Sequence, residues 1–182
     1  MPRLPSFSSL ALSSLDSLFA RISLRLTIVG IISSMLIYIP NYFFLQLLTA
    51  EQSARILISL GYPSFVENLG NAILLNNFEV TRECTGIQGI VPIAVFLSAM
   101  PGIRRTRKVL AVLSAGYTIY LANILRITLE LAIYSSGILS WPLIHDEIGF
   151  GFSVASVVVT LFLAGRIVAP NGVQDLAKTL LR

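Results

Sequence analysis

Residues Arg104–Arg126, RRTRKVLAVLSAGYTIYLANILR, join a strongly basic run to a long apolar one. Arg104–Lys108 carries three arginines and one lysine, whereas Val109–Leu125 carries no Asp, Glu, Lys, Arg or His. A helix that spans a bilayer needs about 20 mostly apolar residues, within a range of about 17–25. Short loops rich in Lys and Arg stay in the cytosol. This stretch therefore predicts a transmembrane helix that starts at the cytosolic face and reaches Arg126 near its outer end.

Three further windows without Asp, Glu, Lys, Arg or His are long enough to span a membrane: Leu26–Ala50, Cys84–Ile103 and Ile148–Gly165. Backbone groups in lipid must be bonded within their own segment, so these windows predict helices. The composition agrees, because 55% of the 182 residues are hydrophobic and 12% are charged, against about 25% charged in soluble domains. The expected fold class is an all-α membrane protein, a compact bundle of about four transmembrane helices.

The segments between these windows alternate in charge. Met1–Arg25 and Arg166–Arg182 are net basic like Arg104–Lys108, whereas Glu51–Glu83 and Arg126–Glu147 are net acidic. Because basic loops stay inside, both termini are expected in the cytosol and the acidic segments outside. The sequence therefore predicts a multi-pass protein of the cell (plasma) membrane. We expect Arg104–Lys108 also to touch anionic membrane lipids, and we expect no nucleic-acid partner.

This topology divides the chain into three parts. Residues 1–25 form a cytosolic or interfacial N-terminal segment, either an amphipathic helix on the inner leaflet or a loose tail. Residues 26–170 form the transmembrane domain, with a kink expected at Pro40-Asn41. Residues 171–182 form a cytosolic tail. Within the external segment Gln52–Arg82 we expect a short helix and an extended piece around Phe78–Thr81.

Three rare residues share the outer face in this topology. Cys84 is the only cysteine and His145 the only histidine of the chain, and Arg126 lies at the same depth. A thiol, an imidazole and an intramembrane arginine at one depth are typical of an enzyme with a cysteine nucleophile. One cysteine and one histidine are too few for a four-ligand zinc or haem site, so we expect no metal and no cofactor.

The residues around Cys84 favour a reactive thiol. Thr85 and Gln88 have the spacing of a capping box, which places Cys84 just before a helix N-terminus. The helix dipole there lowers the pKa of a thiol, although Glu83 opposes this effect. Gly86, with Gly89, allows another helix to approach closely. The alternative is a small buried apolar cysteine without chemistry.

Arg126 shares one helix face with Asn123 and Glu130, at the i, i+3 and i+7 positions. An arginine inside a membrane helix usually faces the bundle interior or a wet cavity. As a catalytic group, Arg126 would stabilise an oxyanion. The alternative is a structural Arg126–Glu130 pair, in which case Glu130→Gln should damage folding about as much as Arg126→Gln. With a catalytic Arg126 we expect Glu130→Gln to stay largely active. His145 is either an acid–base partner of the thiol or a solvated loop residue, and no triad carboxylate is predicted.

The motifs Glu83-Cys84-Thr85-Gly86 and Asn123-Ile124-Leu125-Arg126, followed by His145, resemble the exosortase/archaeosortase family. These are multi-pass membrane cysteine enzymes of prokaryotes. The resemblance covers roughly Thr81 to Phe152, and many relatives carry more helices. It implies that Cys84 is the nucleophile, Arg126 the transition-state stabiliser and His145 the proton-transfer group. Glu83, Thr85, Gly86 and Asn123 would support them.

The resemblance also implies a substrate and a reaction. The enzyme would act as a cysteine protease and transpeptidase on exported proteins that carry a C-terminal sorting tail of motif, transmembrane helix and basic cluster. A thioester on Cys84 would pass to an amine or lipid acceptor. Two alternatives remain at this point: a non-enzymatic multi-pass subunit or chaperone with a structural Arg126–Glu130 pair, and a small transporter that uses Arg126 as an anion site.

Overall fold

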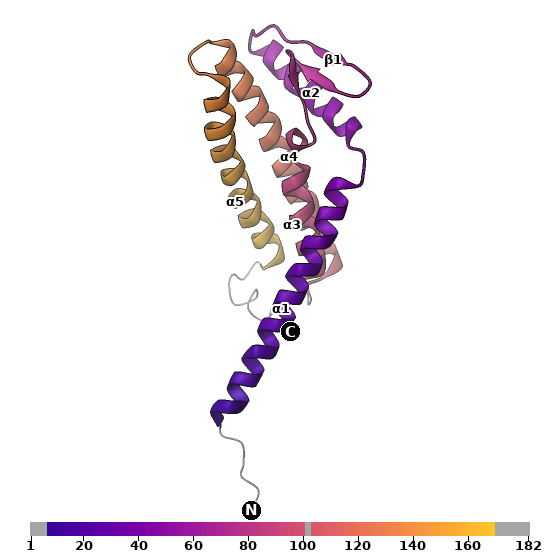
Figure 1. Ribbon diagram of the computed structural model, residues 1–182, viewed down its shortest axis with the longest axis vertical. Coiled ribbons are helices and arrows are strands. Elements are labelled where there is room, and N and C mark those ends of the chain that lie inside the picture. Colours follow the sequence, from indigo (N-terminus) through magenta and orange to yellow (C-terminus); the bar gives the residue numbers. More distant parts are fainter. Residues whose placement is uncertain (1–6, 101–102, 170–182) are drawn as a thin grey trace, which may run out of the picture.

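The computed structural model describes residues 7–100 and 103–169. Five helices dominate these residues (Figure 1). They are α1 (Phe7–Tyr38), α2 (Phe43–Ser59), α3 (Ile87–Ala99), α4 (Arg105–Ser135) and α5 (Gly149–Val168). Three short strands lie between α2 and α3: β1 (Val66–Asn68), β2 (Ile73–Leu75) and β3 (Phe78–Glu79). A 3₁₀ turn, η1 (Glu83–Thr85), precedes α3, and a π-helical turn, η2 (Leu143–Ile148), precedes α5. The chain is thus a helical membrane protein that also carries a small sheet.

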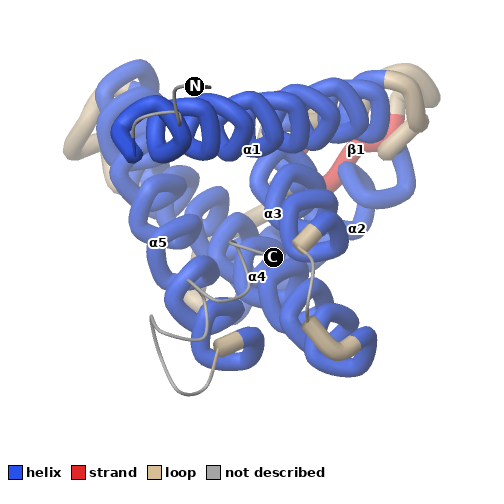
Figure 2. The backbone as a smooth tube through the Cα atoms, turned by 90° about the horizontal axis from the view of Figure 1, so that it is seen from below, coloured by secondary structure: helices blue, strands red, loops and turns tan. Residues whose placement is uncertain are grey.

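Two of the helical segments are long and apolar enough to cross a membrane by themselves. They are Arg105–Ser135 and Leu143–Val168, the second of which includes η2. These segments pack against each other, and α4 also contacts α2 and α3, so it is the central helix of the bundle (Figure 2). The outward faces of α4 and α5 carry exposed residues such as Leu113, Tyr117 and Phe162, as expected for surfaces that face lipid.

The first apolar window is a broken helix pair. Ser23–Tyr38 and Phe43–Ser59 meet at an angle of 74°, which makes the pair a broken span or a re-entrant loop. This break confirms the predicted kink at Pro40-Asn41. Its cause is that proline cannot donate the backbone hydrogen bond that would continue the helix. Arg82 donates to the Tyr38 carbonyl (3.4 Å) and lies over its ring, so it satisfies one carbonyl that the break leaves free.

The second window, Cys84–Ile103, does not form a full-length span. Its helix α3 has 13 residues, which gives about 20 Å of rise against a hydrocarbon core of about 30 Å. The first residues of the window belong to the turn η1 and to Gly86, so α3 begins only at Ile87. The prediction of about four spanning helices therefore becomes two full helices, one broken pair and one short helix.

The N-terminal part of α1 runs without interruption through residue 25, from Phe7 onward. The predicted boundary at residue 25 is therefore not marked by an end of secondary structure. Residues 1–6 and the predicted tail 171–182 lie outside the described residues. The run Arg104–Lys108 was predicted to be a loop, and this is wrong, because α4 begins at Arg105.

The strands form an antiparallel sheet in the order β1-β2-β3. Leu75 pairs with Val66 on one side and with Phe78 on the other. Asn76 and Asn77 form the two-residue loop between β2 and β3, both with positive φ, as this tight hairpin requires. The extended piece predicted around Phe78–Thr81 begins with β3. A buried cluster joins the sheet to α2 and α4: Ala50, Ala54, Leu57, Ile73, Leu75, Val80, Ile127 and Leu131.

The sheet and the α4–α5 turn lie at one end of the bundle, and the start of α4 lies at the other (Figure 1). The acidic segments include the sheet and the turn between α4 and α5. Arg104–Lys108 lies at the start of α4 and Arg166 in the last turn of α5, toward the opposite end. This separation of charge agrees with the alternation read from the sequence.

Candidate active site

Cys84 lies in the middle of η1, immediately ahead of α3. Gly86 ends this turn with φ +75°, a conformation that residues with a side chain rarely adopt. The predicted capping box does not form. The Thr85 hydroxyl donates to the Arg82 carbonyl (2.7 Å) and accepts only a long bond from the Ile87 amide (3.4 Å), whereas Gln88 donates to the Glu83 carboxylate (3.3 Å). Cys84 is therefore held by the turn and not by the cap of α3.

Contacts from α4 fix the backbone around Cys84. The Asn123 side-chain amide donates to the Cys84 carbonyl, and Asn123 is buried. A Cβ at Gly86 would lie 3.3 Å from Ile119 Cγ2 and 3.4 Å from Asn123 Cβ, and one at Gly89 would lie 3.4 Å from Ile119. The close helix approach predicted for Gly86 and Gly89 is confirmed. The Cys84 sulfur itself is partly buried and lies 3.6 Å from the Thr81 hydroxyl.

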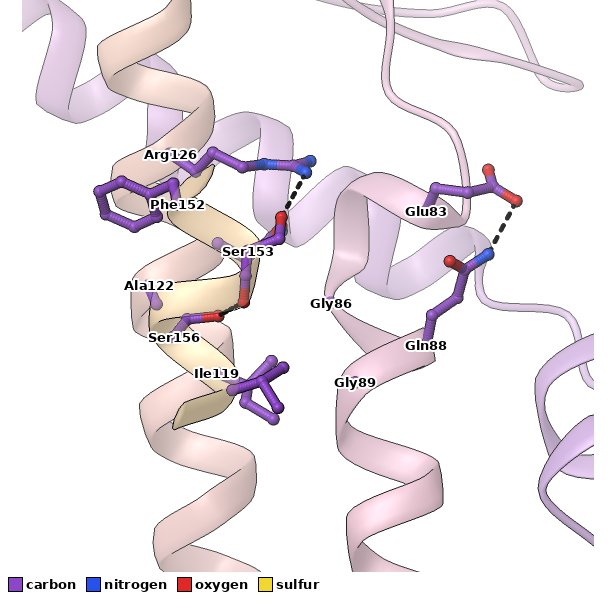
Figure 3. A pocket seen from close by; sticks show the side chains of 12 residues that line it. Glu83, Gly86, Gln88, Gly89, Ile119, Ala122, Arg126, Phe152, Ser153 and Ser156 are labelled. Carbon is purple, nitrogen blue, oxygen red and sulfur yellow. Dashed lines mark hydrogen bonds between the residues drawn. The ribbon is translucent and has the colours of Figure 1, made fainter. Parts of the chain in front are cut away.

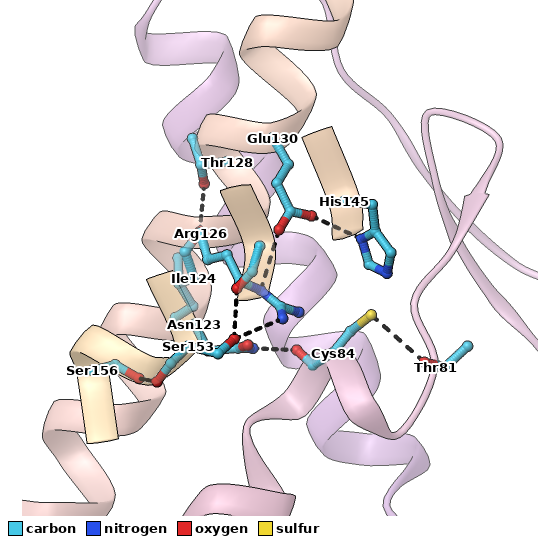
Figure 4. A network of polar contacts seen from close by, with 11 residues as sticks. Thr81, Cys84, Asn123, Ile124, Arg126, Thr128, Glu130, His145, Ser153 and Ser156 are labelled. Atoms are coloured by element: carbon cyan, nitrogen blue, oxygen red, sulfur yellow. Dashed lines mark hydrogen bonds and ion pairs between the residues drawn. The ribbon is translucent and has the colours of Figure 1, made fainter. Parts of the chain in front are cut away.

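Arg126 projects from α4 toward η1, between Glu130 and the Cys84 backbone (Figure 4). Its Nη1 donates to the Ser153 hydroxyl of α5 (3.2 Å), and its Nε lies 3.5 Å from Glu130 Oε1. Ser153 in turn donates to the Gly149 carbonyl (2.8 Å). The guanidinium is therefore held by two helices, and the end of its side chain points toward Cys84 in Figure 4.

His145 lies in η2, so it belongs to the helical entry into α5 and not to a loop. Its Nδ1 is 3.2 Å from Glu130 Oε2, and its ring stacks on Trp141 with centroids 5.3 Å apart. Trp141 stacks in turn on Phe78 (4.1 Å) and meets Tyr134 edge-on. This aromatic cluster connects the sheet to η2 and restrains the imidazole, whose side chain is 42% exposed.

Cys84 and His145 line one cavity of about 210 Å³, together with Glu130, Thr81, Phe78 and Trp141. Figure 4 shows the imidazole edge opposite Glu130 turned toward the Cys84 sulfur. A second cavity of about 300 Å³ lies on the other side of η1 (Figure 3). Arg126, Glu83, Asn123 and Ser153 line its polar part, and Ile119 and Val157 line its apolar part. The candidate residues thus lie between two cavities.

Glu83 stands at the rim of the second cavity and is exposed. Hydrogen bonds from its backbone amide and from the Thr81 hydroxyl lower the pKa of its carboxyl below the usual value. Glu83 therefore stays ionised at neutral pH. Within residues 7–100 and 103–169, no group of three or more His, Cys, Asp and Glu side chains converges where it could hold a metal ion.

A comparison with models of protein families identifies the family of the chain. The family model of the transmembrane exosortases matches residues 6–163. The chain belongs to the transmembrane exosortase family. No curated protein and no solved structure matches it. The sequence-based recognition of this family is confirmed, and the family places the chain among sortase-like membrane proteins that process exported proteins with sorting signals.

The structure of this exosortase adds residues that the sequence analysis did not assign. Glu130 was weighed only as a partner of Arg126, and its contact with His145 was missed. The two residues are separated by a turn, and no sequence spacing links them. Ser153 was not singled out at all. Trp141, whose ring stacks on His145, was not assigned to the site either.

Proposed function

We propose that this exosortase-family protein is a cysteine peptidase and transpeptidase that cleaves the C-terminal sorting signal of exported proteins. The observation that carries the proposal is that Cys84 and His145, the only thiol and the only imidazole of the chain, line one cavity. Arg126 approaches the same point from α4 (Figure 4). A nucleophile, an acid–base group and a cationic donor are the parts that acyl transfer requires.

In the proposed reaction the Cys84 thiol passes its proton to His145, and the sulfur attacks the carbonyl carbon of the scissile peptide bond. Arg126 donates to the oxyanion of the tetrahedral intermediate. The carbon–nitrogen bond then breaks, and the proton on His145 moves to the leaving amine. The product that stays bound is a thioester between Cys84 and the exported protein.

The second half of the reaction releases the thioester. An acceptor amine, a hydroxyl of a lipid acceptor or water attacks the thioester carbonyl and gives a proton to His145. The carbon–sulfur bond breaks, and His145 returns the proton to the Cys84 sulfur. The supporting residues hold this geometry: Asn123 through the Cys84 carbonyl and Gly86 through the close approach of α4.

The proposed orientation places the site on the extracytoplasmic side of the plasma membrane. Its support is that Arg104–Lys108 lies at the opposite end of the bundle from the sheet and from the turn between α4 and α5 (Figure 1), which adjoin η1 and η2 in the chain. An exported protein would therefore reach the site after translocation. Residues 26–170 would form the membrane domain, flanked by cytosolic segments 1–25 and 171–182.

The alternative of a non-enzymatic subunit rests on the Arg126–Glu130 pair, which is present at 3.5 Å. That interpretation does not require Cys84 and His145 to line a common cavity, and for this reason we favour the enzyme. The transporter alternative has less support, because Arg126 lies in the outer half of α4, beside η1 and η2.

The test is a processing assay with an exported reporter that ends in a sorting motif, an apolar helix and an Arg/Lys cluster from the same genome. Cys84→Ala and Cys84→Ser are expected to insert normally and to abolish the size shift, because a serine hydroxyl is not activated by this histidine alone. The wild-type protein should also trap a hydroxylamine-sensitive adduct. Full processing by either variant would exclude covalent thiol catalysis.

A further inference from the structure

Glu130 is the most completely buried ionisable side chain near the site, with 3% of it exposed. Its two carboxylate oxygens have different partners. Oε1 faces Arg126 Nε at 3.5 Å, and Oε2 faces His145 Nδ1 at 3.2 Å. A buried carboxylate is costly unless it is paired, and here a single carboxylate is shared by both basic groups of the candidate site.

Gly149 leaves the space that the Glu130 carboxylate occupies. A Cβ built on Gly149 would lie 2.5 Å from Glu130 Oε1, which is closer than atoms approach without a bond. Glycine at the first residue of α5 therefore lets the carboxylate pass close to the α5 backbone and reach η2. A Cβ built on the nearby Gly151 would have no atom within 4 Å. The need for glycine is therefore specific to position 149.

We infer that Glu130 is a positioning residue that holds the His145 proton on Nδ1 and aims the Arg126 guanidinium, and that Gly149 provides the clearance it needs. A carboxylate accepts hydrogen bonds only, so Nδ1 must be the protonated nitrogen of neutral His145. Nε2 then carries the lone pair that takes the Cys84 proton. This inference rests on the proposed function for its role in the reaction, but the position of the proton is measurable without any substrate.

Glutamine at position 130 would not replace this carboxylate, although it has the same size. A carboxylate accepts at both oxygens, whereas an amide accepts at one atom and donates at the other. The Arg126 guanidinium always donates, so the amide oxygen is expected to face it. The amide NH₂ would then face His145 Nδ1, which can only accept if its own proton moves to Nε2. Glu130→Gln therefore places the proton on the nitrogen that should act as the base.

The test uses the fact that the chain has one histidine. Histidine-selective ¹⁵N labelling of the detergent-solubilised full chain gives one imidazole, and its nitrogen shifts report which nitrogen is protonated. We expect Nδ1–H in the wild type and Nε2–H in Glu130→Gln. Glu147→Gln is the matched control, since it removes an exposed carboxylate of η2 and should leave Nδ1–H unchanged. The same tautomer in the wild type and in Glu130→Gln would overturn the inference.

Activity gives the second measurement. Loss of a group that orients a metal-bound histidine costs about 10–100-fold, and a misplaced tautomer of a catalytic histidine costs up to about 10⁴-fold in serine-type triads. We expect Glu130→Gln to lower processing of the reporter at least 10²-fold. This reverses the expectation from sequence, which treated Glu130 only as a structural partner of Arg126.

Gly149→Ala tests the same contact without removing the carboxylate. The side chain of Glu130 is flexible at its far end, so the added methyl group should displace the carboxylate and leave the fold intact. We expect loss of the single Nδ1–H signal and at least tenfold slower processing, with unchanged thermal unfolding and elution. Gly151→Ala should keep wild-type activity within twofold. Wild-type activity in Gly149→Ala would contradict the inference.

These outcomes separate the inference from the proposed function. If Glu130→Gln moves the proton but processing stays at the wild-type level, the positioning role in the reaction is wrong while thiol catalysis stands. If Cys84→Ala remains active, the proposed function is wrong, and the tautomer measurement still decides whether Glu130 controls His145.

Discussion

Replacement of Arg126 by lysine separates the catalytic role of this residue from its structural role. Lysine keeps the positive charge and the i, i+4 relation to Glu130, so the buried carboxylate retains a partner. It loses the planar fork that now contacts Ser153 Oγ at 3.2 Å and Glu130 at 3.5 Å at the same time. Ser153 still donates to the Gly149 carbonyl, so it is not left without a hydrogen bond.

The two roles predict different magnitudes. The lost bond from the charged guanidinium to Ser153 should lower the free energy of unfolding by about 1.5–3 kcal/mol. A single ammonium held at Glu130 cannot also reach the developing oxyanion, and loss of one oxyanion donor costs about 10²–10³ in rate, or about 2.7–4 kcal/mol of transition-state stabilisation. We therefore expect Arg126→Lys to fold with this loss of stability and to process substrate at least 10²-fold more slowly.

The assay measures processing of the sorting-tail reporter and thermal unfolding of the same purified protein in detergent. Arg55→Lys is the matched control, because Arg55 forms an exposed i, i+4 pair with Glu51 (3.9 Å) away from the candidate site. It should change neither quantity, since exposed pairs contribute little. A fully active Arg126→Lys would refute the oxyanion role and leave Arg126 as a structural residue.

Two further predictions concern the turn at Cys84 and the topology. Gly86→Ala should lower the free energy of unfolding by more than Gly137→Ala does. Both glycines have a positive φ, +71° at Gly137, and the backbone strain of a side chain there costs about 1–2 kcal/mol. Only at Gly86 would the added Cβ also lie 3.3 Å from Ile119, whereas Gly137 has open space around it. Equal losses in chemical denaturation would contradict this packing argument. A membrane-impermeant thiol reagent should label Cys84 in intact cells and should not label Thr106→Cys placed in a Cys84→Ala background. Labelling of the Thr106→Cys variant from outside would reverse the topology and move the site to the cytosolic face.

The long apolar windows were sufficient to predict the two full spans. The windows Val109–Leu125 and Ile148–Gly165 fall within α4 and within the segment Leu143–Val168, because a helix is the only way for an isolated apolar segment to satisfy its backbone in lipid. The break at Pro40 was also predictable, since proline removes a specific backbone hydrogen bond. At these positions the local sequence alone determines the secondary structure that the fold contains.

The details of the candidate site depend on tertiary contacts that no window contains. The conformation of Gly86 is set jointly by the end of η1 and by the approach of Ile119 and Asn123 from α4. The contact between Glu130 and His145 requires the turn after α4 and the wide π-helical η2 to bring the imidazole back over α4. The i, i+4 spacing along α4 therefore predicts the Arg126–Glu130 pair but does not predict His145 as the second partner of Glu130.

The irregular parts of the backbone gather where the candidate residues are. The 74° break between α1 and α2 is tied to η1 through Arg82, which contacts the Tyr38 carbonyl and directly precedes Glu83. The turn η1 itself carries Cys84, and η2 carries His145. In a membrane, non-helical or distorted backbone is tolerated where protein or a wet cavity satisfies its polar groups. Residues of η1 and η2 line the two cavities. The regular helices therefore form the scaffold, and these two distorted turns carry the candidate reactive side chains. The turns η1 and η2, unlike the break at Pro40, are the points at which reasoning from periodicity failed, as expected if local regularity has been given up for a functional site.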